Sequence, residues 1–120
     1  MTLNAAFWLL TVAVVLGGSL ALPYLRTALR RLPWPLRVAH GVAGAAGLAV
    51  LLAVLRHGLP SSEMGTAGFG PAAALLLALA LLLGLGIVFW RRRPPGVLVA
   101  CHAGVAIAGF VVLWTVWSLG

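Results

Sequence analysis

Four uninterrupted apolar segments constrain the fold of this chain more than any other feature of its sequence. They cover about residues 3–25, 36–55, 71–90 and 96–119, and each is near the roughly 20 residues that cross a bilayer core as a helix. All four are rich in Ala and Leu and lack the alternation of barrel strands. A helix also pairs its backbone groups within its own segment, as lipid requires. The sequence therefore predicts an all-α integral membrane four-helix bundle, a single transmembrane domain over residues 1–120.

The charged residues support this prediction by their scarcity and their placement. They make up 8% of the chain, against about a quarter in a typical soluble domain. The net charge of +7 comes from eight arginines set against a single acid, Glu63. Because the arginines lie at the ends of the apolar segments, and not in a separate basic domain, we expect membrane lipid and no nucleic acid as a partner.

The arginines also predict the orientation. Seven of them lie where the first segment is followed by the second or the third by the fourth: Arg26, Arg30, Arg31, Arg37, Arg91, Arg92 and Arg93. Only Arg56 lies at the opposite ends. By the positive-inside rule the cluster faces the cytoplasm, which puts both termini outside a bacterial-type inner membrane. No positive charge precedes the first segment, so we interpret it as a retained helix and not as a cleaved signal peptide.

An internal repeat relates the two halves of the sequence. A shift of 62 positions aligns Arg30-Arg31 with Arg92-Arg93, Pro33 with Pro95 and His40 with His102. The alignment continues through small and aliphatic residues of the second and fourth segments. Repeats of this kind indicate duplicated structural units. We therefore expect two helical hairpins in tandem, each with a histidine near the start of its second helix.

These two histidines are the main candidates for chemistry. His40 and His102, with Cys101 beside the latter, are the ionisable side chains well inside the apolar segments. An ionisable group within hydrocarbon is costly and is treated by default as a candidate functional residue. Both histidines lie a turn or two from the predicted cytoplasmic boundary, on helices that run in the same direction. Their imidazoles should reach a similar depth, where they could ligate one metal centre from two sides.

Small residues follow each histidine on the same helix face, at positions i+4 and i+7. They are Gly44 and Gly47 in the second segment, and Ala106 and Gly109 in the fourth. Such stripes leave room for a flat ligand. A zinc site needs three or four protein ligands, whereas a b-type haem needs only one or two axial histidines. We predict haem b between His40 and His102, with Arg37 and the arginines at 91–93 available to its propionates.

The two histidines, their His-x6-Gly spacing and the four apolar segments give the chain a resemblance to a known family. It resembles the small four-helix transmembrane b-type cytochromes, the cytochrome b561-like membrane subunits of respiratory complexes. The resemblance implies a bis-histidine haem that passes electrons between a partner redox protein and quinone, in a subunit that is not catalytic alone. Members often hold two haems with four histidines, while this chain has two histidines in its segments. One haem is therefore expected, in a larger complex or a homo-oligomer.

Other interpretations remain open at this stage. The histidines could pack between helices, and the glycines could form close helix contacts, as in a structural or assembly subunit that has no cofactor. A small multidrug-type transporter also has four helices, but its membrane-embedded Glu has no counterpart, because Glu63 falls in a loop. We interpret His57 as a solvated loop residue and Cys101 as a small apolar side chain. No C-x-x-C-H motif is present for covalent haem.

Overall fold

The fold is a bundle of four long helices joined as two hairpins. The computed structural model describes residues 2–26, 33–58, 68–90 and 93–119, and these contain α1 (Leu3–Leu25), α2 (Trp34–Arg56), α3 (Phe69–Phe89) and α4 (Gly96–Leu119). The helices have 21 to 24 residues, and all four are long and apolar enough to cross a membrane. The predicted fold class is confirmed: the chain is an all-α, multi-pass membrane protein with a four-helix bundle.

The first residues of α2 and α3 differ from the predicted starts of the second and third apolar segments. Each helix starts two residues earlier than predicted, at Trp34 and Phe69, and each contains a proline within its first three residues, Pro35 and Pro71. Proline is tolerated there because the first N–H groups of a helix have no intrahelical acceptor and its φ angle suits the helix. At their other ends, α2 runs one residue further than predicted, and α3 stops at Phe89, before Trp90.

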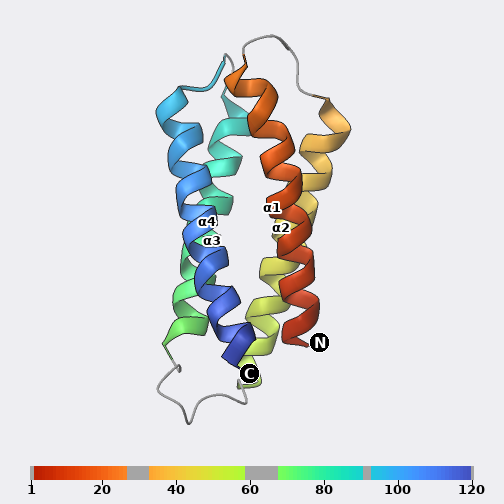
Figure 1. Cartoon of the computed structure of the whole chain (residues 1–120), viewed down its shortest axis with the longest axis vertical. Helices are drawn as coiled ribbons and strands as arrows, with labels where there is room; N and C mark the ends of the chain where they lie inside the picture. The colour runs from red at the N-terminus through yellow and green to blue at the C-terminus, as the bar shows by residue number, and fades with distance from the viewer. Residues whose placement is uncertain (1, 27–32, 59–67, 91–92, 120) are drawn as a thin grey trace.

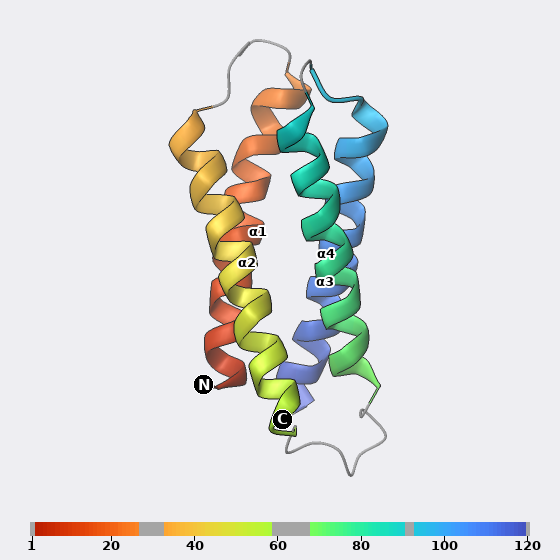
Figure 2. The same cartoon turned by 180° about the vertical axis from the view of Figure 1, so that it is seen from behind.

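The helices are arranged in a ring in chain order. In each hairpin the two helices pack closely on one another, α1 on α2 and α3 on α4 (Figures 1 and 2). The hairpins meet along two further seams, α2 against α3 and α1 against α4. The helices on each diagonal, α1 with α3 and α2 with α4, make no close backbone contact among the described residues. Both chain ends lie at the same end of the bundle (Figure 1).

The predicted tandem repeat is visible in the packing. Most residues of α2 and α4 that are 62 positions apart have the same degree of burial, and most residues of α1 and α3 correspond in this way at a shift of 67. In seven such pairs both residues are buried: Ala6/Ala73, Phe7/Ala74, Leu10/Leu77, Ala13/Ala80, Gly47/Gly109, Leu51/Leu113 and Val54/Val116. The shifts differ because the first hairpin has five more residues between its equivalent positions than the second. Each hairpin is thus one copy of the same packing unit.

Burial is confined to the end of the bundle that carries the termini. The buried residues come from the first halves of α1 and α3 and the second halves of α2 and α4. In the other half, none of the described residues in 14–25, 34–46, 81–89 and 96–108 is fully buried. The outer surface is apolar, with Leu75, Phe89 and Val97 each more than 70% exposed. A water-soluble protein seldom exposes such a surface, whereas lipid solvates it.

Polar and aromatic contacts tie the hairpins together at both ends. Near the termini, the rings of Phe7 in α1 and Trp117 in α4 stack at 4.3 Å, and the Trp117 indole donates to Asn4 Oδ1. At the other end, the Tyr24 hydroxyl donates to the Pro94 carbonyl at 3.0 Å. The Arg93 guanidinium lies 5.0 Å from the centre of the Tyr24 ring. These contacts hold the two hairpins together at both ends of the bundle.

Candidate functional site

The structure brings the two predicted histidines together on the axis of the bundle. His40 lies in the second turn of α2 and His102 in the second turn of α4, and both side chains are half-buried. Their ring centroids are 5.9 Å apart and the ring planes are 87° from parallel. Two imidazoles that bind one metal ion from opposite sides, through bonds of about 2.0–2.1 Å, have their centroids roughly 6 Å apart. The observed separation fits a single metal centre between the rings.

Each imidazole is hydrogen bonded to a backbone carbonyl of the other helix in its own hairpin. His40 Nδ1 lies 2.8 Å from Ala13 O in α1, and His102 Nδ1 lies 2.7 Å from Ala80 O in α3. A carbonyl oxygen only accepts hydrogen bonds, so Nδ1 is the donor and carries the hydrogen in both rings. In the neutral imidazole the lone pair is then on Nε2. Neither Nε2 has a hydrogen-bond partner among the described residues.

Two glycines that the sequence analysis did not select complete these contacts. A Cβ added to Gly17 would lie 2.9 Å from His40 Cε1, and one added to Gly84 would lie 3.0 Å from His102 Cε1. Each imidazole edge therefore rests directly on a glycine backbone. Gly17 and Gly84 are equivalent at the 67-residue shift that relates α1 to α3. That shift could have revealed them, but only the 62-residue alignment of the second and fourth segments was apparent.

The small residues predicted to line a cofactor slot have two different environments. Gly47 and Gly109 are fully buried, and they contact Leu10 of α1 and Leu77 of α3 respectively. These contacts favour the helix-packing interpretation for both glycines, because leucine side chains already occupy the space beside them. Gly44 and Ala106 lie closer to the histidines and are half-buried. They remain candidates for the wall of a cofactor site.

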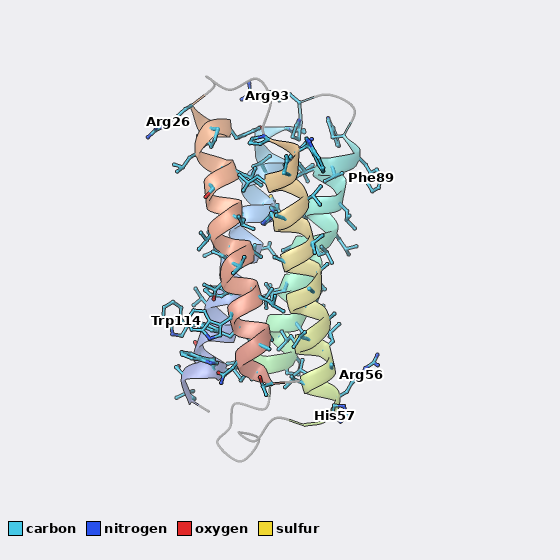
Figure 3. The ribbon with its side chains drawn as sticks, turned by 90° about the vertical axis from the view of Figure 1, so that its right-hand side faces the viewer. Arg26, Arg56, His57, Phe89, Arg93 and Trp114 are labelled. Carbon is cyan, nitrogen blue, oxygen red and sulfur yellow. The ribbon has the colours of Figure 1, made fainter. Side chains whose placement is uncertain are left out.

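The cations at the histidine end are exposed. Arg37 precedes His40 by about one turn of α2, and Arg26 and Arg93 lie at the same end of the bundle (Figure 3). Arg93 also donates to the Tyr24 carbonyl at 3.4 Å, which holds its guanidinium near the first hairpin. The other arginines of the predicted cluster lie outside the described residues: Arg30, Arg31, Arg91 and Arg92.

The remaining polar candidates lie away from the histidine pair. His57 is exposed beside Arg56 at the opposite end of the bundle (Figure 3). Cys101 is exposed although it neighbours His102 in the sequence. Glu63 lies outside the described residues. A groove between α2 and α3, with Arg56 at its edge, is also at the far end and contributes nothing to the histidine site.

The donor set around the histidines limits the kinds of centre that fit. No group of three or more His, Cys, Asp or Glu residues comes together anywhere in the described residues. A structural zinc site, which uses four protein ligands, is not supported by the two histidines. A haem iron takes four ligands from the porphyrin and needs protein ligands only on its two axial sides. The histidine pair thus fits haem iron better than an ion held by protein ligands alone.

Comparison of the chain with protein-family models, curated proteins and solved structures gave no match. The class of protein is defined by the fold itself: a multi-pass membrane four-helix bundle made of two similar hairpins, each with one histidine whose ring lies close to that of the other.

Proposed function

We propose that the chain is an electron-transfer subunit that binds one b-type haem between His40 and His102. Bound haem would supply a one-electron redox centre within the membrane. The central observation is the pair of imidazoles at 5.9 Å, each with Nδ1 bonded to a carbonyl and with no partner for Nε2 among the residues that the structure describes. Metal-ligating histidines almost always donate their second ring N–H in this way, because the bond fixes the ring and raises its basicity.

The surroundings of the pair support this proposal. The half of the bundle that contains the histidines has no fully buried residue among those described, and the small residues Gly44 and Ala106 follow His40 and His102 by about one helical turn. A planar group of the size of a porphyrin needs a part of the bundle that is not already filled by a packed core. Arg37 lies about one turn closer to the membrane boundary than His40 and is exposed, so its guanidinium can pair with a propionate.

The predicted orientation gives the position of the proposed haem in the membrane, and the family resemblance gives its reactants. With the arginine-rich end in the cytoplasm of a bacterial-type cell, the haem would lie nearer the cytoplasmic face of the inner membrane. In this proposal a partner redox protein exchanges electrons with the haem, and quinone in the membrane is the second reactant. The chain supplies the haem site, and a partner subunit supplies catalysis.

A structural or assembly subunit without a cofactor is the second candidate. It is favoured by the same Nδ1 bonds, which join the two helices of each hairpin, and by the buried contacts of Gly47 and Gly109. A packing role accounts for the Nδ1 bonds, but it makes no use of the two Nε2 atoms, which have no hydrogen-bond partner among the described residues.

The stoichiometry of haem separates the two candidates. The chain would be produced in cells supplied with a haem precursor, purified in detergent, and assayed for haem iron and protein. One haem per chain supports the electron-transfer proposal. Protein that stays free of haem, and that binds none when titrated with it, would leave the structural role as the better account. The proposed reaction with quinone is tested separately. The haem-loaded protein would be reduced and then mixed with a soluble quinone analogue, which should oxidise it.

A further inference from the structure

The same three-part contact occurs in both hairpins. A histidine donates to the carbonyl of an alanine on the neighbouring helix, and a glycine follows that alanine by four residues. In the first hairpin the residues are His40, Ala13 and Gly17. In the second they are His102, Ala80 and Gly84. Because the arrangement is repeated at equivalent positions, it is a feature of the duplicated unit and not an accident of one contact.

The spacing of four residues has a geometric reason. In an α-helix the carbonyl of residue i accepts from the N–H of residue i+4. The side chain at i+4 leans towards the N-terminus and covers the surface over the preceding turn. A glycine at i+4 leaves that surface open, so a second donor can reach the carbonyl from outside. Gly17 and Gly84 stand at i+4 from Ala13 and Ala80.

Neighbouring glycines do not share this property. A Cβ added to Gly18, next to Gly17, or to Gly86, two residues after Gly84, would meet no atom within 4 Å. At Gly17 and Gly84 the nearest atoms belong to an imidazole, a rigid ring that is held by its hydrogen bond. An added methyl group would therefore displace the ring.

We propose that Gly17 and Gly84 are positioning residues for the two histidines. By exposing the carbonyls of Ala13 and Ala80, they allow the Nδ1 hydrogen bonds that select the Nδ1–H tautomer. The lone pair of each ring is then on Nε2, the nitrogen left available to a metal. The glycines act through the histidines.

The proposal deepens the proposed haem site, but its central statement concerns the protein without haem. The carbonyl bonds join groups of the protein itself, so the tautomers that they select can be measured in haem-free protein. Free histidine in water favours the Nε2–H tautomer, and loss of the carbonyl bond removes the bias towards Nδ1–H. The state of each imidazole thus reports directly on the glycine beside it.

The test is 15N NMR of haem-free protein with labelled histidine, in which the shifts of Nδ1 and Nε2 distinguish the tautomers. We expect His40 and His102 to be in the Nδ1–H form, with His57 as an exposed reference. Gly17→Ala should change the signals of His40 and leave those of His102, and Gly84→Ala should do the reverse. The matched variants Gly18→Ala and Gly86→Ala should change neither.

A wild-type spectrum with both histidines in the Nε2–H form would overturn the proposal, even if the alanine variants fail to fold. Equal spectra for Gly17→Ala and Gly18→Ala would overturn it as well. Haem titration of the same variants provides a separate reading. If haem binds, Gly17→Ala should weaken it about 10- to 100-fold, the usual effect of removing a support of a metal-ligating histidine. If both histidines have the expected tautomers but the protein binds no haem, the result contradicts the proposed function and leaves the role of the glycines intact.

Discussion

The imidazoles of His40 and His102 lie 5.9 Å apart, although they come from diagonal helices whose backbones make no close contact. Each imidazole is hydrogen bonded to the adjacent helix of its own hairpin and lies close to the imidazole of the other hairpin. In a bundle of two equivalent hairpins, the central axis is where equivalent residues of the two copies meet. Duplication of a hairpin that carries one histidine therefore produces a two-histidine site.

The relative orientation of the rings gives a spectroscopic prediction. The ring planes are 87° from parallel, and each is held by its own carbonyl. We expect the oxidised haem protein to be low spin, with axial imidazole planes close to perpendicular. Electron paramagnetic resonance at low temperature should then show the strongly anisotropic signal of perpendicular ligands. A rhombic signal, typical of parallel imidazole planes, would show that the rings turn when haem binds.

Substitution of the buried glycine at the centre of the first hairpin should destabilise the fold. A Cβ at Gly47 would lie 2.6 Å from Leu10 Cγ and 3.2 Å from the Leu10 backbone nitrogen, so the backbones of α1 and α2 must separate. We expect Gly47→Ala to lower the free energy of unfolding by about 1–3 kcal/mol, the usual cost of overpacking. Gly104→Ala is the control, because its Cβ meets nothing within 4 Å. Equal stabilities in a denaturant titration in micelles would contradict the packing assigned to Gly47.

The indole of Trp117 should contribute through its hydrogen bond as well as its stacking. Trp117→Phe keeps an aromatic ring against Phe7 but removes the donor to Asn4. We expect this variant to lose about 0.5–1.5 kcal/mol of stability, the range for one hydrogen bond. Trp8→Phe serves as the comparison, since Trp8 is 59% exposed. If the two variants have the same midpoint in a thermal denaturation followed by circular dichroism, the hydrogen bond between Trp117 of α4 and Asn4 of α1 does not stabilise the fold.

The predicted orientation can be tested with reporters fused after Gly120. Arg26 and Arg93 lie at the end of the bundle opposite the termini (Figure 3), and by the positive-inside rule we expect that end to face the cytoplasm. A C-terminal alkaline phosphatase, which is active only outside the cytoplasm, should be active. A C-terminal green fluorescent protein exported in unfolded form should be dark. The opposite pair of results would invert the topology and place the histidines near the outer face.

The helices and the histidine pair could be predicted because their physical causes are local. A run of apolar residues as long as α1 has no stable alternative to a helix in lipid, so its existence follows from composition and length. The similar depth of His40 and His102 follows from their positions in two parallel helices. The starts of α2 and α3 were less predictable, because Pro35 and Pro71 suit a first turn as well as the loop before it.

The partners of the small residues could not be predicted from periodicity. Gly44 and Gly47 share a helix face with His40, but the sequence does not say which neighbouring helix covers that face. In the structure Leu10 of α1 covers Gly47. Gly17 was missed for a related reason. Its proposed role depends on a contact between two helices and on a backbone carbonyl, and neither can be recognised from the pattern of side chains in the sequence. The second repeat, at 67 residues, carries that information only once both hairpins are aligned helix by helix.

The central claim is that His40 and His102 hold one haem, and reduced-minus-oxidised absorption spectra test it most directly. The wild type and three variants, His40→Ala, His102→Ala and His57→Ala, would be purified in detergent from cells with ample haem and reduced with dithionite. We predict sharp α and β bands in the wild type and in His57→Ala, and their loss in both His40→Ala and His102→Ala. A featureless wild-type spectrum, or bands that survive both of the central substitutions, would contradict the account.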